Sequence, residues 1–474
     1  MMNDKRTKII ATIGPSSHDK DTLREMVQQG MNVARLNFSH GTADDHREVI
    51  QSLRELGRET DEPIGILADL QGPKLRVGTI KDDPVHYEEG DTFVLTTEAI
   101  EGDRDRIHIN FEEFPQDVNP GEQVLLDDGK IVTEVLETDN EKDVKVKVLH
   151  SGELFSKKGV NLPNTQLSLP CLTDKDREDL ELALENDVDW IGLSFVRSAR
   201  DIIELKHIIR DRKMDVRVIA KIEKPEAIDD IDDILKEADG LMVARGDLGV
   251  EIPMQNVPLI QKMLIQRSLN TAKPVIVATQ MMESMIENIS PSRAEVNDVA
   301  NAVLDGTDAV MLSAETSVGK YPVRVIGSMS KIAMEVEAYD RIYYHESPPE
   351  YNEERFISDS ICYNAARLAK RVDAAAIVTM THSGYTAFKI SSQRPKADVF
   401  VFTGNEKIMS MLNLLWGVRG FFYDKFVSTD HTIDDIKYIL RKKGMVKEND
   451  LVINLASMPI AEKGKSNMLK LSYV

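Results

Sequence analysis

The sequence of 474 residues contains only two cysteines, Cys171 and Cys362, which lie far apart in the chain. Two isolated cysteines argue against a disulfide framework and against a cysteine-based zinc site. The sequence also lacks any run of about 18 apolar residues, which a membrane-spanning helix would need. Its first six residues, Met-Met-Asn-Asp-Lys-Arg, do not contain the apolar core of a signal peptide. These absences predict a cytoplasmic protein that has no membrane segment.

Positive charge is scarce as well. Lys and Arg total 59 against 80 Asp and Glu, which gives a net charge of −21. Nucleic acids and anionic membranes attract basic surfaces, so this balance argues against both as partners. At roughly 100–200 residues per domain, the length predicts two to four domains.

Short apolar runs rich in Ile, Val and Leu recur through the first two-thirds of the chain, separated by amphipathic stretches. Near-continuous apolar runs are typical of strands buried on both faces of a parallel sheet. The eight runs are Lys8–Gly14, Asn32–Ser39, Ile64–Gly72, Trp190–Val196, Arg217–Glu223, Leu241–Gly246, Pro274–Thr279 and Ala309–Ser313. Segments between them, such as Asp21–Gln29 and Leu259–Leu269, have helical spacing. Eight strands alternating with helices favour a TIM (β/α)8 barrel, with an open doubly wound sheet as the alternative.

One stretch, from about Gln71 to Ser168, interrupts this alternation. It shows period-two patterning and hairpin signals such as Asp128-Gly129, which predict an all-β domain inserted after the third barrel strand. Active sites of such barrels lie at the carboxyl ends of the strands, so an insertion there would form a lid.

The polar, proline-bearing stretch Tyr339–Glu354 predicts a linker, and the strand and helix patterns beyond it predict a C-terminal α/β domain. The expected boundaries are residues 1–70 and 169–340 for the barrel, 71–168 for the inserted β-barrel lid and 341–474 for the C-terminal domain.

Charged and polar residues stand at the ends of several predicted strands. They include Arg35, Asn37, Ser39, His40, Asp69, Lys221, Glu223, Arg245, Asp247 and Thr279. Strand ends converge at one face of a barrel, so these side chains could share one pocket. Glu223 and Asp247 offer oxygen ligands suited to Mg²⁺ or Mn²⁺, while Arg35, Arg76 and Lys221 suit a phosphoryl group. The alternatives are surface ion pairs for the cations and a turn cap for Asp247, but ion pairing alone would not require five such strand ends.

Several longer segments resemble signatures of one enzyme family. They are Gly30–Gly41, Ile219–Glu223, Met242–Glu251, Ala278–Met285, Pro291–Gly306 and Met311–Thr316. In this order they resemble the pyruvate kinase family, in its bacterial type. The resemblance covers essentially the whole chain, including the β insertion and the C-terminal domain. It implies a glycolytic enzyme that transfers the phosphoryl group of phosphoenolpyruvate to ADP, giving pyruvate and ATP.

The resemblance also implies roles for individual residues. Lys221 would contact the transferring phosphoryl group and stabilise the enolate, and Thr279 would lie on the side where the enolate is protonated. Glu223 and Asp247 would bind one Mg²⁺ or Mn²⁺, and a second ion would arrive with the nucleotide. Arg35 and Arg76 would hold phosphate, and backbone groups of Arg245, Gly246 and Asp247 would bind the substrate carboxylate. The residues implied for the nucleotide are Asn37, Ser39, His40, Arg76 and Lys175. Ser313 and Glu315 would belong to the proton-delivery network.

One departure from the family pattern concerns K⁺. Many members bind K⁺ through Asn, Ser, Asp and Thr, with a Glu five residues beyond the Asp. Here Leu70 stands at the Thr position and Lys74 at the Glu position. A lysine ammonium can replace a monovalent cation, so Lys74 is a candidate catalytic residue and we expect K⁺ not to be required. The alternative is a solvated hinge lysine beside a packing leucine.

The stretch Thr379–Ala387 is predicted to run from a strand through a polar loop into a helix. Such a helix start suits a phosphate, although an ordinary capped helix is the alternative. In the family this loop binds a phosphorylated allosteric effector, which implies Thr381, His382, Ser383, Gly384 and Thr386 as the effector site of a regulatory domain. Met458 replaces a family tryptophan, so ribose 5-phosphate, glucose 6-phosphate and AMP are better candidates than fructose 1,6-bisphosphate. The family is commonly tetrameric, so a homotetramer is expected.

Two other functions compete with this interpretation. A metal-dependent barrel lyase acting on an enolpyruvate would use similar carboxylates, but it leaves the lid and His40 without a role. A phosphosugar-sensing pseudoenzyme would need a lost catalytic group, yet Lys221, Glu223, Asp247 and Thr279 are all present.

Overall fold

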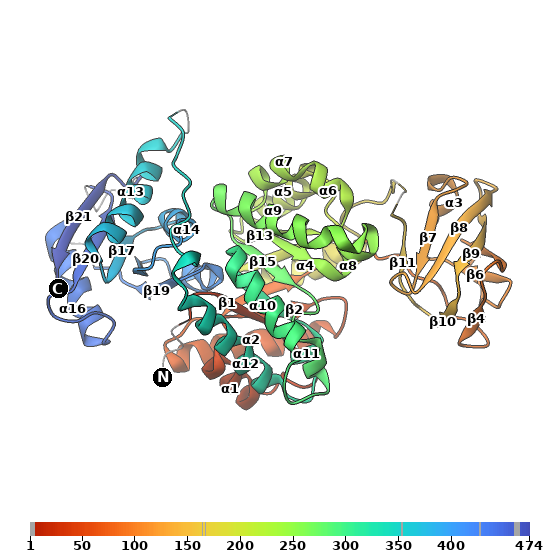
Figure 1. The fold of residues 1–474 in the computed structure, drawn as a ribbon, viewed down its shortest axis with the longest axis horizontal. Helices are drawn as coiled ribbons and strands as arrows, with labels where there is room; N and C mark the ends of the chain where they lie inside the picture. Colours follow the sequence, from red (N-terminus) through yellow and green to blue (C-terminus); the bar gives the residue numbers. More distant parts are fainter. Residues whose placement is uncertain (1–4, 164, 166, 352–353, 426–427, 459–464) are drawn as a thin grey trace.

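The computed structural model describes residues 5–163, 165, 167–351, 354–425, 428–458 and 465–474. Figure 1 shows the chain in three parts, with a barrel of strands and helices between a group of β-strands at one end and a C-terminal α/β unit at the other. Among the described residues, no helix is both long and apolar enough to cross a bilayer.

Eight parallel strands close into a barrel in the order β1-β16-β15-β14-β13-β12-β3-β2. The strands are β1 (Lys8–Thr12), β2 (Val33–Asn37), β3 (Gly65–Asp69), β12 (Trp190–Leu193), β13 (Arg217–Ile222), β14 (Gly240–Ala244), β15 (Val275–Ala278) and β16 (Ala309–Leu312). Each coincides with one of the eight apolar runs, and the sheet is closed. The predicted TIM barrel is therefore confirmed, and the open doubly wound sheet is not formed.

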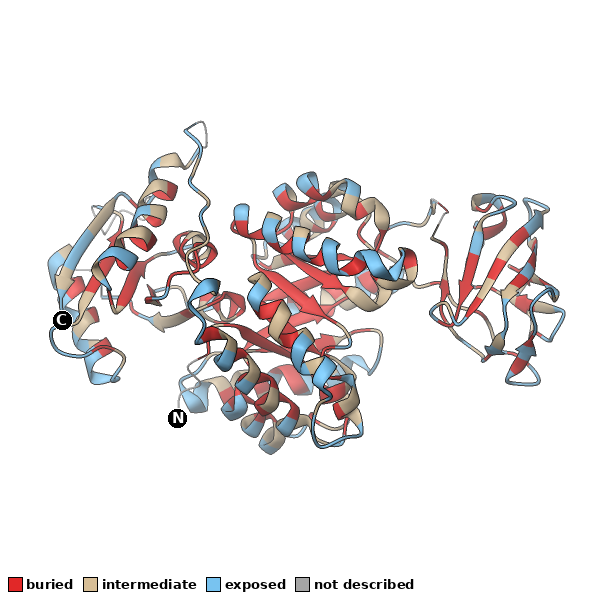
Figure 2. Ribbon diagram, viewed as in Figure 1, coloured by how far each residue is buried: buried red, intermediate tan, exposed pale blue. Residues whose placement is uncertain are grey.

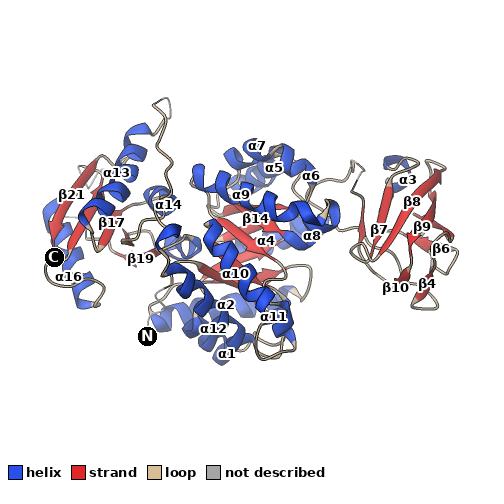
Figure 3. Ribbon diagram, in the orientation of Figure 1, coloured by secondary structure: helices blue, strands red, loops and turns tan. Residues whose placement is uncertain are grey.

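Helices surround these strands, as Figure 3 shows. They are α1 (Lys20–Gln29), α2 (Ala43–Thr60), α4 (Asp174–Glu185), α5 (Ala199–Asp211), α6 (Pro225–Asp229), α7 (Ile231–Glu237), α8 (Arg245–Glu251), α9 (Val257–Asn270), α10 (Arg293–Asp305), α11 (Ala314–Ser317) and α12 (Pro322–Glu337). Capping boxes at Thr42, Thr173 and Ser292 satisfy backbone N–H groups where α2, α4 and α10 begin. Gly30 and Gly306 adopt positive φ where α1 and α10 end.

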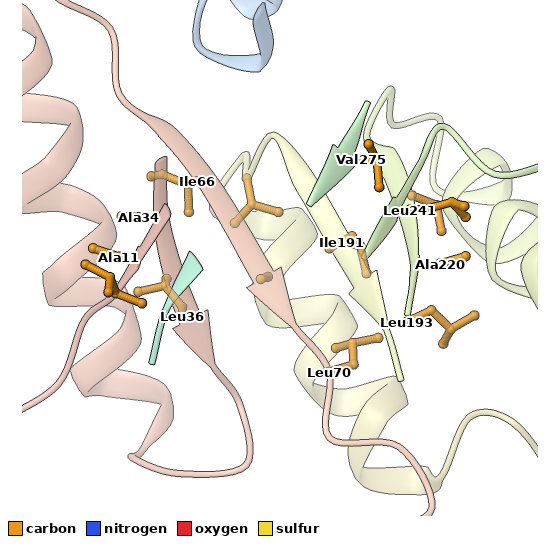
Figure 4. Packing of buried hydrophobic residues seen from close by; sticks show 14 of the residues in the cluster. Ala11, Ala34, Leu36, Ile66, Leu70, Ile191, Leu193, Ala220, Leu241 and Val275 are labelled. Carbon is orange, nitrogen blue, oxygen red and sulfur yellow. The ribbon is translucent and has the colours of Figure 1, made fainter. Parts of the chain in front are cut away.

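Side chains of the barrel strands alternate between two buried clusters. Ala11, Leu36 and Ile191 belong to the cluster that includes the surrounding helices, part of which Figure 4 shows. Residues one position away, such as Ile10 and Ile219, belong to a second cluster that continues into the C-terminal unit. Because strand side chains alternate, residues two positions apart share a face. Lys221 therefore lies on the same barrel-facing side of β13 as Ile219.

The segment between β3 and α4 forms two separate sheets with their own core. The strands are β4 (Val85–Tyr87), β5 (Thr92–Thr96), β6 (Arg106–His108), β7 (Gln123–Leu126), β8 (Ile131–Thr138), β9 (Asp143–His150), β10 (Gly152–Leu154) and β11 (Val160–Asn161), with one short helix, α3 (Phe114–Asp117). We call this unit the β insertion. Its β7–β8 hairpin turns at Asp127, Asp128 and Gly129, all with positive φ, at the Asp-Gly pair that the sequence singled out.

The C-terminal unit is a five-stranded sheet in the order β19-β18-β17-β20-β21, parallel except for β21. Its elements are α13 (Phe356–Val372), β17 (Ala376–Met380), α14 (Tyr385–Ser392), β18 (Asp398–Thr403), α15 (Glu406–Met411), β19 (Val418–Phe422), α16 (Thr429–Lys442), β20 (Leu451–Ala456) and β21 (Met468–Tyr473). The predicted α/β class is confirmed. Figure 2 shows buried residues running through both this unit and the barrel.

Buried polar contacts join this C-terminal unit to the base of the barrel, where the strands begin. Arg394 forms an ion pair with Asp308 at 2.9 Å, and both side chains are almost fully buried. Ser410 donates a hydrogen bond to Asp189, and the Trp190 indole donates to the Met411 carbonyl. The C-terminal unit therefore closes the amino-terminal end of the barrel and leaves the opposite end free for a site.

Candidate active site

Lys221 lies at the carboxyl end of β13 within a cluster of charged side chains. Its Nζ is 3.1 Å from Asp69 Oδ1 and 3.0 Å from Glu223 Oε1, and it donates a 2.6 Å hydrogen bond to Ser194 Oγ. Arg35, in the middle of β2, donates to Asp69 Oδ2 at 2.7 Å. Lys221 is 11% exposed and Asp69 only 1%. Four neighbouring strands thus bring two cations, two carboxylates and the Ser194 hydroxyl together, and the strand-end pattern predicted that such side chains converge.

Burial and pairing set the protonation of this cluster. Burial lowers the pKa of Lys221, but the Asp69 and Glu223 carboxylates outweigh it and raise that pKa above its ordinary value. For Asp69, burial raises the pKa, but Lys221 and Arg35 hold it below the usual range. Lys221 therefore carries its positive charge throughout the physiological pH range.

One glycine, Gly192, makes room for the contact between Asp69 and Lys221. Gly192 of β12 pairs with Asp69 in the sheet register. A Cβ at Gly192 would lie 3.0 Å from Asp69 Oδ1, closer than ordinary van der Waals contact. The absence of a side chain at this position gives the Asp69 carboxylate room to reach Lys221.

Glu223 and Asp247 supply the carboxylates expected to bind a divalent cation. Glu223 is buried and accepts a 2.7 Å hydrogen bond from the Phe195 N–H. Asp247, near the start of α8, is 31% exposed. Burial raises the pKa of Glu223, Lys221 lowers it, and the charge of Asp247 raises it further. A divalent cation between two carboxylates would relieve that repulsion, so the donor set fits Mg²⁺ or Mn²⁺.

A divalent cation bound by Glu223 and Asp247 would need further ligands. Within the described part of the chain, no group of three or more His, Cys, Asp or Glu side chains is arranged to hold a metal ion. Two carboxylates leave most of an octahedral shell to water and substrate oxygens, which is the usual situation for Mg²⁺.

Thr279 follows β15 in a strained conformation. Its φ is +67° and that of Gln280 is +54°, which is an outlier for a β-branched residue. Thr279 Oγ1 accepts a 2.7 Å hydrogen bond from the Gly246 N–H, so this N–H is already engaged. The Arg245 guanidinium donates to the Thr279 carbonyl at 2.8 Å and pairs with both carboxylate oxygens of Asp298. The side chain of Arg245 therefore holds the Thr279 backbone and Asp298 together.

The residues expected near the nucleotide lie around the loop that follows β2. Asn37 accepts a hydrogen bond from the Ser39 N–H, and the His40 carbonyl contacts the His46 ring. Lys175, on α4, donates to the Phe38 carbonyl at 2.8 Å. Asn37, Ser39, His40 and Lys175 thus form one group beside the Arg35 end of the cluster.

A cavity of about 810 Å³ opens beside Asp247 and Thr279. Its lining includes Lys74, Asp128, Arg245, Gly246, Asp247, Thr279, Ser313 and Glu315. Lys74 Nζ is 3.8 Å from Asp247 Oδ1. Glu315 is buried, accepts from the Ser313 and Met282 N–H groups, and has a pKa raised by that burial. The cavity is therefore lined both by a residue of the β insertion, Asp128, and by the residues expected for proton delivery, Ser313 and Glu315.

Several predicted sets do not line this cavity. Arg35, Lys221 and Glu223 lie in the charged cluster, and Asn37, Ser39, His40 and Lys175 lie around the loop after β2. Arg76 is at the base of the β insertion, where it donates to the Lys157 carbonyl and its N–H donates to Asn110 Oδ1. Thr381, His382, Ser383, Gly384 and Thr386 lie in the C-terminal unit, between β17 and α14. Gly384 has φ +82° and donates to Thr381 Oγ1, while Thr386 Oγ1 is 3.0 Å from Ser466 Oγ.

Sequence reasoning missed two residues of the site. Ser194 directly follows β12 and contacts Lys221, so the strand-end criterion could have found it. Asp298 lies in the middle of α10, 20 residues after β15 ends and 11 before β16 begins, so the strand-end criterion does not reach it.

A closed (β/α)8 barrel with buried, paired charges at the carboxyl ends of its strands defines a barrel enzyme. Comparisons with known proteins make the assignment narrower. Residues 4–326 match the pyruvate kinase barrel domain, and residues 359–472 match the pyruvate kinase alpha/beta domain. The chain belongs to the pyruvate kinase family, and it is an enzyme of the phosphotransferase class.

Individual pyruvate kinases are similar to this chain over nearly its full length. A pyruvate kinase of Mycobacterium tuberculosis is 43% identical over 468 residues, covering 98% of each chain. One from Staphylococcus epidermidis is 40% identical over 471 residues, covering 99% of this chain and 80% of the relative. The crystal structure of a pyruvate kinase from Cryptosporidium parvum superimposes with a TM-score of 0.93 at 34% identity, covering 100% of this chain and 97% of that one. The family assignment removes the grounds for the lyase and pseudoenzyme alternatives.

Proposed function

We propose that this enzyme transfers the phosphoryl group of phosphoenolpyruvate to ADP, as the last ATP-forming step of glycolysis in the cytoplasm. The observation that carries the proposal is the buried, permanently charged Lys221 held between Asp69 and Glu223. A fixed cation in a water-poor site is suited to stabilise negative charge that develops during reaction. The family relationship supports the same substrates.

The phosphoryl step needs charge neutralisation and alignment more than covalent help. An oxygen of the ADP β-phosphate attacks phosphorus, and the bond from phosphorus to the enol oxygen breaks. Lys221 and Arg35 face the phosphoryl oxygens and the enolate oxygen, and Asp69 holds both cations in place. A divalent cation held by Glu223 and Asp247 would supply further positive charge to the substrate carboxylate and enolate oxygens. The Gly72–Lys74 segment leads into the β insertion, which we propose closes over ADP and excludes water.

The enolate must then take a proton at its methylene carbon to become pyruvate. Thr279 Oγ1 donates to the Ala278 carbonyl at 2.6 Å and accepts from Gly246, so its hydroxyl is held in one orientation. We propose that Thr279, with Ser313 and Glu315, which line the same cavity, guides this proton, directly or through water. Glu315 suits the role because its raised pKa favours holding a proton.

A coupled assay that detects pyruvate from phosphoenolpyruvate and ADP tests the proposed function. We expect turnover with Mg²⁺ or Mn²⁺ and none after chelation. Pyruvate formed without consumption of ADP would contradict phosphoryl transfer, and so would carbon–carbon cleavage products.

We also propose that K⁺ is not required, because Lys74 takes its place. The contact between Lys74 Nζ and Asp247 puts an ammonium beside a candidate metal ligand, and Leu70 is buried without a hydroxyl to offer. We expect full turnover in K⁺-free buffer with saturating Mg²⁺. Lys74→Glu should make activity depend on K⁺ by about tenfold or more, from loss of a charge stabilisation of about 1.4 kcal/mol or more. Steady-state rates with and without K⁺ measure this.

Lys81→Glu, a matched change at an exposed lysine of the β insertion, is the control and should remain insensitive to K⁺. A strict K⁺ requirement in the parent enzyme would refute the role of Lys74.

Allosteric regulation and quaternary structure are also part of the proposed function. We propose that a phosphorylated metabolite binds at Thr381–Thr386 and activates the enzyme, that the enzyme is a homotetramer, and that the domains divide after residues 70, 168 and 340. The loop supports this because the backbone of Gly384 is turned by its positive φ at the start of α14, and Ser383 is exposed.

Activation should be visible as a several-fold lower half-saturating phosphoenolpyruvate concentration, within the usual range of about 5–150-fold for allosteric coupling. Ribose 5-phosphate, glucose 6-phosphate and AMP are the ligands to compare. Ser383→Asp should abolish the shift because it adds negative charge where phosphate would bind. Asn364→Asp, which adds the same charge at an exposed position on α13, should keep it. Equal responses of both variants would contradict the assigned loop.

A further inference from the structure

A buried ion pair that the proposed mechanism does not use joins the two segments carrying the candidate metal ligands. Lys224 Nζ lies 2.7 Å from Glu251 Oε1, and the side chains are 8% and 1% exposed. Lys224 directly follows Glu223 in the chain, and Glu251 is the last residue of α8, the helix that contains Asp247. The ion pair therefore connects the end of β13 to α8.

The β insertion reaches the same carboxylate. Asn161, in β11, donates a 2.8 Å hydrogen bond from Nδ2 to Glu251 Oε1. Lys224, Glu251 and Asn161 also line a cavity of about 30 Å³, whose other walls come from both chain segments that connect the β insertion to the barrel and from Phe195 and Arg197 after β12. Glu251 is thus the point where α8, β13 and the β insertion meet.

Glu251 is not fully satisfied in this position. Its second oxygen, Oε2, is buried and has no hydrogen-bond partner among the described residues. A buried carboxylate oxygen without a partner lowers stability, and such local conflicts are found where function requires a particular geometry. An ion pair selected for stability alone would be expected to use both oxygens.

We propose that Lys224 and Glu251 are positioning residues that fix the separation of Glu223 and Asp247, and with it the affinity for the divalent cation. Asn161 ties this geometry to the position of the β insertion. Two carboxylates repel each other, so an ion is bound tightly only when their spacing is held by the surrounding residues. The inference rests on the proposed function, in which Glu223 and Asp247 bind the ion.

The test is the binding of Mn²⁺ to the full chain without substrate, followed by the electron paramagnetic resonance signal of free Mn²⁺. Glu251→Gln keeps the size of the side chain but removes its charge, and should raise the dissociation constant by about tenfold or more, as outer residues of metal sites do. Lys224→Met should have the same effect, and Lys224→Arg, which keeps the charge, should restore binding to within about threefold of the parent.

The matched control is Asp308→Asn, which breaks an equally buried ion pair, with Arg394, at the base of the barrel. It should leave the Mn²⁺ dissociation constant unchanged, even if it lowers the melting temperature. Asn161→Ala should leave Mn²⁺ binding unchanged in the absence of nucleotide but raise the KM for ADP, because only the link to the β insertion is lost.

Mn²⁺ affinity of folded Glu251→Gln within twofold of the parent would overturn the inference. If that variant does not fold, equal Mn²⁺ affinities of Lys224→Met and Lys224→Arg would overturn it. Pyruvate formation tests the proposed function separately: a parent chain that binds Mn²⁺ but forms no pyruvate would refute that function and leave the positioning role intact.

Discussion

Replacing Lys221 with Met is expected to lower kcat by about 10³–10⁵-fold while phosphoenolpyruvate still binds. The estimate follows from the effect of single cations on phosphoryl transfer. Lys221 is held 3.0–3.1 Å from two carboxylates, so its ammonium is already in place before the charge develops. Met fills a similar volume without the charge. Steady-state turnover and calorimetric binding of phosphoenolpyruvate separate the two effects.

Lys206→Met is the control for this prediction. Lys206 pairs with Asp239 at the start of β14, at the opposite end of the barrel, so its loss should affect stability and leave kcat nearly unchanged. A Lys221→Met enzyme with more than a tenth of the parent's kcat would refute the assigned role.

The second large effect is expected for Glu223→Gln. The change keeps a hydrogen-bond acceptor for the Phe195 N–H but removes one of the two negative charges offered to the divalent cation. We expect kcat/KM at fixed Mg²⁺ to fall by about 10³-fold, which corresponds to about 4 kcal/mol of transition-state stabilisation. The Mg²⁺ concentration for half-maximal activity should rise as well, and a metal titration of the rate measures both.

Asp189→Asn provides a comparison at another buried carboxylate. Asp189 contacts Arg54 and Ser410 at the base of the barrel, so its variant should need no more Mg²⁺ than the parent. An unchanged Mg²⁺ requirement in Glu223→Gln would remove Glu223 from the metal site.

Much of the fold could be predicted because the hydrophobic pattern of each strand matches its burial in the barrel. The barrel strands are buried on both faces, so each is a short apolar run bounded by polar residues, and their number specifies closure. The same logic placed Arg35, Lys221 and Glu223 in one cluster, since strand ends at one face must converge.

Residues whose role depends on packing between distant segments could not be found in this way. Asp298 reaches Arg245 from a helix, and Glu251 reaches Lys224 from the end of another. Both lie in segments that resemble the family, but neither stands at a strand end, so the pattern that found the cluster does not single them out. Strands β19 and β21, at the edges of the C-terminal sheet, were also not predicted, because partly exposed edge strands lack a continuous apolar run.

The inward-facing residues at the base of the barrel share one core with the C-terminal unit. Ile219, Met242 and Ile276 from the barrel belong to the same buried cluster as Leu412 and Leu455. Removing residues 356–474 would therefore expose the floor of the barrel to water, in addition to deleting the loop that we propose binds an effector. We expect the two units to melt in a single cooperative transition, and a shortened chain ending near residue 340 to aggregate instead of yielding an unregulated enzyme.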